Sequence, residues 1–404
     1  MSKKTQSQVG FVALMAALMS VTALAIDALL PALDTIGIAI GTETAADNQL
    51  LVTMIFMGLG IGPLLFGPLS DAYGRKSSVY IGFAIFIGAS FICVNAESLA
   101  VMILGRLLQG VGLSALRTIC IAIIRDLFEG DYMARIMSFV TVVFLLVPIV
   151  APAMGKVILD YYDWQSIFYV QIIISLLVAF WFWRGQRETL AEEKRIPFGT
   201  KRIIKGFKET IKYKRTMGFT IIQGFIVCSF LVYLSASQQI FEVQYGLKEE
   251  FPYIFAGLAI AIGSAIFLNG SFVVRFGMEK LVTLALIGFF IASLLYLVVF
   301  YQGSRPDVMV LVGFFAMQFF FIGFLFGNLR ALAMEPVGHI AGIGAAITGL
   351  ISTLMAVPIS TLIGRHVEQT TYPLFIGFSV CAGISLVILY FIKKEARSHK
   401  TVVA

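Results

Sequence analysis

Apolar runs of about 20 residues recur along the whole chain, and they restrict it to one class of fold. A helix of that length spans the hydrocarbon core of a bilayer. A backbone in lipid must satisfy its own hydrogen bonds, which only helices and closed barrels achieve. These runs favour helices because barrel strands would alternate apolar and polar residues. Charged residues make up only 13% of the chain, about half the share of a soluble domain. The sequence therefore predicts an all-α polytopic membrane protein.

The apolar runs predict twelve transmembrane helices. They cover roughly residues 9–33, 50–69, 78–95, 99–124, 134–159, 165–184, 217–237, 253–274, 281–301, 308–331, 340–363 and 373–392. A polar, highly charged segment divides the spans into two sets of six. We predict an N-terminal six-helix bundle over residues 1–186, a cytoplasmic linker over 187–215, and a C-terminal six-helix bundle with a short cytoplasmic tail over 216–404.

The first residues also fit a second interpretation. Lys3 and Lys4, followed by an apolar run that contains Ala23-Leu24-Ala25, resemble a signal peptide with its cleavage site. The apolar run is longer than the usual core of a signal peptide, and eleven further spans follow it. We therefore expect the first span to remain as a helix.

Basic residues predict the orientation, since loops rich in Lys and Arg favour the cytoplasmic side. With the N-terminus inside, most of the 30 Lys and Arg residues lie in cytoplasmic segments. This predicts a multi-pass protein of the bacterial inner membrane with both termini in the cytoplasm. Contact with anionic membrane lipids accounts for the net charge of +7, so a nucleic-acid partner is not required.

The sequence contains no signature of an enzyme. It has no phosphate-binding loop of the GxxxxGK[ST] type, and its four cysteines and three histidines have no metal-ligand spacing. We expect no catalytic residues, no metal and no cofactor. A membrane sensor is a further alternative, but such a protein would normally carry a soluble output domain.

The stretch GPLSDAYGRK, after the second span, combines two glycines with an acid and two bases. Gly67 permits close helix approach and Gly74 a tight turn. Asp71 can face a helix terminus or a basic side chain, while Arg75 and Lys76 can hold the cytoplasmic surface. We call these five residues the conformational latch, because such a cluster suits helices that separate during transport.

This stretch resembles the signature loop of the major facilitator superfamily. A weaker echo, GSFVVRFG over residues 270–277, suggests that the two bundles are pseudo-symmetric repeats. RLLQGVG (106–112) and VPIVAPAMG (147–155) are similar to motifs of drug:proton antiporters, although Ala151 replaces a usual glycine. The stretches IDALLPAL, DWQSIF and MEPVGHIAG are similar to the bicyclomycin- and chloramphenicol-resistance branch. The resemblance implies multidrug efflux by proton antiport with alternating access, and we expect a monomer powered by the proton gradient.

Charges within the spans are the candidate functional residues, since a charge in lipid is costly and normally faces the bundle interior. Asp27 lies on a small, polar stripe of the first span, and burial disfavours the charged form of a carboxylate. We predict that Asp27 exchanges protons and that Arg106 is its ion-pair partner. An acid simply wetted from the periplasm is the alternative. We expect Pro148 and Pro152 to kink the fifth span, a candidate gating helix that also contains Gly155.

Several polar residues are predicted to line a substrate cavity. They are Gln109, Arg117, Tyr233, Ser237, Gln238, Asn328 and Arg330. For Arg330, an ion pair with Glu335 is an equally supported alternative. Three arginines against one clear acid favour neutral or anionic compounds over lipophilic cations. A dedicated exporter of an anionic or metal-chelating metabolite, such as a siderophore, therefore stays open beside drug export, and proton-coupled uptake is a third possibility.

Overall fold

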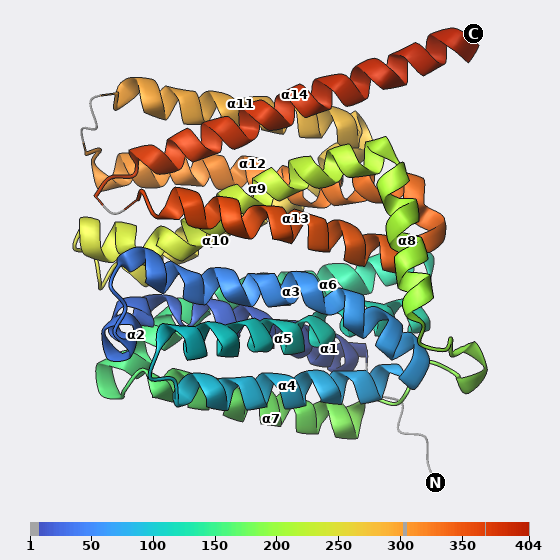
Figure 1. Ribbon diagram of the computed structural model, residues 1–404, viewed down its shortest axis with the longest axis horizontal. Helices are drawn as coiled ribbons and strands as arrows, with labels where there is room; N and C mark the ends of the chain where they lie inside the picture. The colour runs from blue at the N-terminus through green and yellow to red at the C-terminus, as the bar shows by residue number, and fades with distance from the viewer. Residues whose placement is uncertain (1–7, 302–304, 368, 404) are drawn as a thin grey trace. The chain divides into compact units, whose positions relative to one another are not determined.

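In the computed structural model, residues 8–301, 305–367 and 369–403 are described, and every regular element among them is helical (Figure 1). Within these residues, eleven helical segments are long and apolar enough to cross a membrane. One segment, Val308–Gly364, contains two such helices joined by a short 3-10 turn. The all-α membrane fold and its spans are therefore confirmed. Lys3 and Lys4, on which the signal-peptide interpretation depends, lie outside the described residues.

The chain divides into two compact units, Met1–Thr200 and Lys201–Ala404. The division falls inside the segment predicted as a linker. The first unit contains α1 (Gln8–Asp27), η1 (Leu30–Ala32), α2 (Leu33–Ile40), α3 (Ala45–Tyr73), α4 (Arg75–Val94), α5 (Leu99–Leu127), α6 (Gly130–Tyr161), α7 (Gln165–Gly185) and η2 (Glu192–Lys194). Helix α8 (Thr200–Lys212) begins at the division. The second unit continues with α9 (Lys214–Gln238), the π-helix η3 (Gln239–Gln244), α10 (Phe251–Phe276), α11 (Met278–Val299), α12 (Val308–Met334), η4 (Glu335–Ile340), α13 (Ala341–Gly364) and α14 (Tyr372–Val403).

The first span differs from the prediction because its helix breaks at Asp27. The sequence predicts one helix over residues 9–33, whereas α1 ends at Asp27 and the 3-10 turn η1 leads into α2. Pro31 is the physical reason. It has no N–H to donate to the carbonyl four residues earlier, which is that of Asp27, and its ring crowds that carbonyl. The acid therefore stands at the C-terminal end of a helix.

Helices α3 and α5 of the first unit approach each other at backbone distance. A Cβ built on Gly110 would collide with the carbonyl oxygen of Ile55, and one built on Gly58 would collide with that of Leu107. In membranes, small residues allow such close approach, and van der Waals packing then contributes much of the association. This contact fixes α5, the helix that also contains Arg106, against α3.

Matching glycines begin equivalent helices in the two units. Gly74 precedes α4 with φ 98° and ψ 157°, and Gly277 precedes α11 with φ 79° and ψ 152°. Residues with a Cβ rarely adopt this backbone region. The two glycines are the last residues of GPLSDAYG and of its echo GSFVVRFG.

A second matching contact joins the next two helices of each unit. The hydroxyl of Ser90 on α4 accepts a hydrogen bond from Gln109 on α5 at 2.8 Å, and that of Ser293 on α11 accepts one from Gln318 on α12 at 2.7 Å. Each serine stands at the same distance along the chain from the glycine that precedes its helix. These equivalent contacts support the internal repeat that the sequence suggested.

The close approach of α3 and α5 predicts that even one added methyl group at Gly110 is destabilising. Gly110→Ala would place its Cβ against the Ile55 backbone, which cannot rotate away. We expect a loss of about 1–3 kcal/mol, the usual range for overpacking, seen as a lower melting temperature of the purified protein in detergent.

The matched control is Gly88→Ala on α4, where an added Cβ meets no heavy atom within 4 Å. It should leave the melting temperature nearly unchanged. Equal melting temperatures for both variants would show that the α3–α5 contact is looser than described.

Candidate functional site

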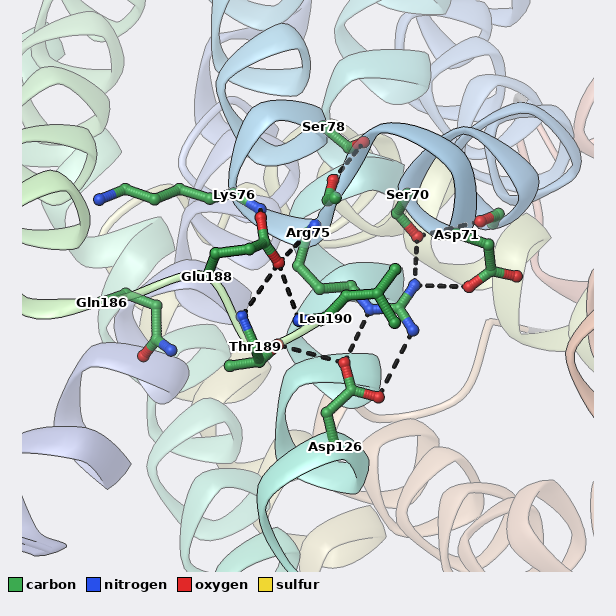
Figure 2. A network of polar contacts seen from close by, with 12 residues as sticks. Ser70, Asp71, Arg75, Lys76, Ser78, Asp126, Gln186, Glu188, Thr189 and Leu190 are labelled. Atoms are coloured by element: carbon green, nitrogen blue, oxygen red, sulfur yellow. Dashed lines mark hydrogen bonds and ion pairs between the residues drawn. The ribbon is translucent and has the colours of Figure 1, made fainter. Parts of the chain in front are cut away.

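The conformational latch is organised around a buried arginine (Figure 2). The Arg75 side chain, 4% exposed, donates from Nη1 to Asp71 Oδ1 at 2.6 Å and to Ser70 Oγ at 2.8 Å. Its Nε donates to Asp126 Oδ2 at 2.8 Å. Asp71 belongs to α3, Arg75 to α4 and Asp126 to α5. One guanidinium therefore ties together the ends of three helices.

A carboxylate from the segment after α7 completes this cluster (Figure 2). Glu188 accepts hydrogen bonds from the backbone N–H groups of Arg75 and Lys76, both at 3.0 Å. These are the first two residues of α4, whose N-cap, Gly74, has no side chain to accept them. The first N–H groups of a helix have no intrahelical partner, so they need an external acceptor. Glu188 thus acts as the N-terminal cap of α4 from a distant part of the chain.

The segment after α7 is anchored at further points. Glu188 Oε1 also accepts the backbone N–H groups of Thr189 and Leu190 at 3.0 Å. The Thr189 hydroxyl donates to Asp126 Oδ2 at 3.1 Å, and the Ile196 N–H donates to the Asp71 carbonyl at 2.9 Å. This part of the predicted linker is therefore an ordered element of the first unit.

The charge state of Glu188 follows from these contacts. Partial burial raises the pKa of its carboxyl group, but the four backbone hydrogen bonds, which stabilise the charged form, outweigh burial and lower the pKa below its ordinary value. The charged form of Glu188 thus holds the N-terminus of α4.

Arg75, which the sequence predicts to hold the cytoplasmic surface, is buried within the cluster. One expectation about the latch is wrong. Among the described residues no close helix approach occurs at Gly67, where an added Cβ would meet no heavy atom within 4 Å. Lys76 is only partly exposed, and its ammonium donates to the Trp183 carbonyl near the end of α7 at 3.1 Å.

Sequence reasoning missed Glu188 and Asp126, because both stand far from GPLSDAYGRK along the chain. One signal pointed to such an acceptor. A helix that begins directly after a glycine has no capping side chain of its own, and capping residues are normally Ser, Thr, Asp or Asn. The sequence alone does not say which distant acid supplies the cap.

The second cluster surrounds the break after α1. Asp27 is 6% exposed, and within residues 8–301, 305–367 and 369–403 its carboxylate makes no hydrogen bond or ion pair. The predicted ion pair with Arg106 is therefore absent from the described part of the chain. Asp27 also lies at the negative end of the α1 dipole, which disfavours a second negative charge there.

Arg106 is fully buried and binds main-chain carbonyls. Its Nη1 donates to the Ala25 carbonyl at 3.1 Å and to Gln109 Oε1 at 2.7 Å, while its Nε donates to the Leu51 carbonyl at 2.8 Å. The α-helical donor for the Ala25 carbonyl would be the Leu29 N–H, which instead bonds the carbonyl of Ile26, three residues before it. Arg106 thus stabilises the last turn of α1. Among the described residues its Nη2 has no hydrogen-bond partner.

Helix α6 packs against this same break. A Cβ built on Gly155 would collide with the carbonyl oxygen of Ala28, the residue after Asp27. Pro148 and Pro152 lie in the same helix, which continues through both of them. The candidate gating helix therefore contacts the chain directly beside the buried acid.

Four of the predicted cavity residues of the second unit, Tyr233, Ser237, Gln238 and Asn328, are buried and contact neighbouring side chains or carbonyls. The Tyr233 ring lies edge-on to those of Phe315 and Phe319, with centroid distances of 4.9 and 4.5 Å. The Ser237 hydroxyl donates to the Leu234 carbonyl. Two amides complete the set: Gln238 donates to Glu242 at 2.9 Å, and Asn328 donates to Asn269 at 2.7 Å.

Arg117 and Arg330, the two further arginines predicted to line the substrate cavity, are exposed. In the part of the chain that the structure describes, Arg330 forms no ion pair, so the alternative pairing with Glu335 is not formed. Glu335 instead accepts from Arg215 at 2.9 Å, and Arg215 also donates to Glu279 at 2.7 Å. The side chains of Arg330 and Arg117 are accessible to solvent, and Gln109 is occupied by Arg106 and Ser90.

Comparison with known proteins identifies the family. Residues 11–360 match the sequence profile of the Major Facilitator Superfamily. The chain belongs to this superfamily. It is 30% identical over 362 residues to an uncharacterized MFS-type transporter, YdgK, of Bacillus subtilis, with 88% of each chain covered.

Two further relatives have names that refer to resistance. One is a bicyclomycin resistance protein homolog of Haemophilus influenzae, 26% identical with 85% of this chain and 86% of the relative covered. The other is the multidrug resistance protein MdtL of Shewanella oneidensis, 25% identical with 87% and 88% covered. These names agree with the drug:proton antiporter branch that the motifs resemble.

Solved structures show the same fold. A D-xylose-proton symporter superposes with a TM-score of 0.71 at 14% identity, covering 95% of this chain and 96% of its own. The human organic anion transporter MFSD10 superposes with a TM-score of 0.65 at 15% identity, covering 96% and 99%. The family and its relatives are transporters, which are not enzymes.

The capping contact of Glu188 predicts that Glu188→Gln loosens the start of α4. Glutamine keeps the shape of the side chain but replaces one acceptor oxygen with an NH₂ group, so one of the two hydrogen bonds to the start of α4 is lost. We expect amide exchange at Arg75 and Lys76 to become several-fold faster in hydrogen-exchange mass spectrometry of the full-length protein.

Glu193→Gln, at an exposed position in the same segment, is the control and should not alter this exchange. The pH dependence has a defined sign. Because the folded-state pKa of Glu188 is lowered, its stabilisation is present above the ordinary Glu pKa of about 4.3 and is lost as the pH falls through the lowered value. Equal protection of wild type and Glu188→Gln at neutral pH would exclude the capping role.

Proposed function

We propose that this protein is a proton-coupled antiporter of the bacterial inner membrane that exports small amphipathic compounds, including antibiotics, by alternating access. Membership of the Major Facilitator Superfamily and the resistance proteins among its relatives support export of drugs. The excess of basic residues in the predicted cytoplasmic segments supports an orientation with both termini inside.

The observation that carries the proton coupling is the buried carboxylate at the break in the first span. Asp27 has no described partner and stands at the end of α1. An unpaired charge is costly to bury, so these surroundings favour proton uptake by the carboxylate. A group that gains a charge only when solvent reaches it suits a coupling site that is exposed to each side of the membrane in turn.

Contacts around Asp27 can couple its protonation to the positions of α1 and α6. Arg106 stabilises the last turn of α1 through the Ala25 carbonyl, and α6 contacts Ala28 through Gly155. Ionisation of Asp27 would attract the unpartnered Nη2 of Arg106. In our proposal this attraction shifts the end of α1 against α6, and the latch around Arg75 stabilises one of the two access states. The proton gradient supplies the energy, so the mechanism needs no cofactor, and one chain suffices.

A dedicated exporter of an anionic or metal-chelating metabolite is the second candidate. The unpartnered Nη2 of Arg106 and the exposed side chains of Arg117 and Arg330 favour it, because they provide three cationic groups, whereas Asp27 and Glu242 are the two buried acids among the described residues. Proton-coupled uptake receives less support, since two relatives of this chain are named resistance proteins.

Proton coupling at Asp27 predicts that Asp27→Asn abolishes substrate-driven proton movement. Everted membrane vesicles with an acidic interior would be supplied with bicyclomycin or another candidate substrate, and dissipation of the gradient would be followed by dye fluorescence. Wild type should dissipate the gradient. In Asp27→Asn the rate of dissipation should be at least about tenfold lower, because the amide cannot exchange a proton.

Glu97→Gln, which changes an exposed carboxylate, is the matched control and should behave as wild type. If Asp27→Asn dissipates the gradient as fast as wild type, the proton travels by another acid and Asp27 is structural.

The excess of arginine predicts a preference for uncharged or acidic substrates. In the same vesicles, bicyclomycin or a carboxylate-bearing antibiotic should dissipate the gradient at lower concentrations than ethidium, a lipophilic cation. Arg330→Gln should weaken the response to the acidic compound more than the response to the neutral one. A response to ethidium alone would contradict the charge argument while leaving proton coupling intact.

A further inference from the structure

Among the described helices of more than eight residues, α8 is the one that is not a candidate membrane span. It lies along the chain between two helices that are candidate spans, α7 and α9. Tyr213 alone separates it from α9, which begins at Lys214 and is long and apolar enough to cross the bilayer. Figure 1 shows α8 running across the direction of α9 and α13. Its covalent connection therefore holds α8 at the level where the bilayer ends.

Two adjacent faces of α8 are directed away from its own unit. At 100° per residue, Lys201, Lys205, Lys208 and Lys212 lie within about 60° of one another and form a single stripe. We call these four residues the lysine stripe. Beside it lies an apolar face of Ile204, Phe207 and Ile211, whose side chains are 54%, 38% and 43% exposed. Exposed apolar side chains in a row indicate a partner for that face.

The third face attaches α8 to the second unit. Gly206 and Thr210 are buried there, and a Cβ on Gly206 would collide with Ile343 of α13. Glu209 contacts His339 of η4 at 2.6 Å. These contacts leave the side chains of the apolar face and of the lysine stripe exposed.

We propose that the lysine stripe and the apolar face of α8 form a docking surface for anionic phospholipids of the adjoining membrane leaflet. The apolar side chains would enter the boundary between headgroups and acyl chains, as in interfacial amphipathic helices. The lysine ammonium groups would bind the lipid phosphates. Docking in the membrane plane would then hold α8, and through the Glu209–His339 contact η4, in place.

Charge and polarity together select a lipid as the occupant. A soluble anion would complement the lysine stripe but would leave Ile204, Phe207 and Ile211 in water. An apolar protein surface would cover those three side chains but would leave the four ammonium groups without counter-charges. An anionic bilayer satisfies both faces at once, and the connection to α9 already places it within reach. The inference does not depend on the substrate or on proton coupling.

The test is hydrogen-exchange mass spectrometry of the full-length protein in lipid nanodiscs, without substrate or proton gradient. Discs of phosphatidylcholine are compared with discs that also contain phosphatidylglycerol. Near an anionic surface each lysine adds about 1 kcal/mol, which is about fivefold in affinity. We therefore expect exchange in α8 to slow by at least about tenfold in the anionic discs, while exchange in α9 stays the same.

The decisive variant replaces the lysine stripe with glutamine (K201Q/K205Q/K208Q/K212Q) and should lose the protection. The control replaces four lysines outside α8 (K194Q/K248Q/K280Q/K394Q) and should keep it, although its net charge changes equally. Unchanged α9 exchange shows that each variant is folded. Phe207→Ser should reduce the protection without removing it.

Three results would overturn the proposal. Equal exchange of α8 in both kinds of disc would exclude recognition of anionic lipid. Loss of protection in the control variant would assign the effect to overall charge. Protection that appears in phosphatidylcholine discs on addition of inorganic phosphate would assign the lysine stripe to a soluble anion. The lipid experiment can still be interpreted if the transport experiments fail, because it measures exchange in α8 without substrate or proton gradient.

Discussion

The requirement that every buried backbone group find a hydrogen-bond partner governs this structure. Inside a helix the requirement is met locally, so difficulties arise where helices break or begin. Pro31 breaks the first span after Asp27, and Arg106 supplies a donor for the Ala25 carbonyl. Gly74 begins α4 without a capping side chain, and Glu188 supplies the acceptor. Both candidate sites are therefore places where a charged side chain completes the backbone of another element.

The two units share a scaffold but not their functional residues. The glycine that precedes α4 or α11 and the glutamine–serine contact recur in both. Three residues before the glutamine, the first unit has the buried Arg106, whereas the second has Phe315, which packs against Tyr233. Duplication thus explains the packing. At this position a buried charge in the first unit is replaced by aromatic packing in the second.

The segment between the two sets of spans has two structural roles. Its first part binds the latch, since Glu188, Thr189 and Ile196 contact α4, α5 and α3. Its last part is α8, which presents lysines and apolar side chains to the surroundings. A sequence that reads as a polar linker is therefore mostly ordered structure, because its first part bonds to the latch and α8 packs against Ile343 and His339.

The sequence by itself determined the all-helical membrane fold, the spans and the superfamily, because apolar periodicity, Gly and Pro act over one or two helical turns. It also singled out Asp27 and Arg106, since charges in apolar runs are conspicuous. Only the tertiary structure decided their partners. Arg106 binds carbonyls because the helix break leaves one without its usual donor, and Glu188 reaches Arg75 across 113 positions of the chain. Such contacts depend on how helices pack, and no local pattern in the sequence records that.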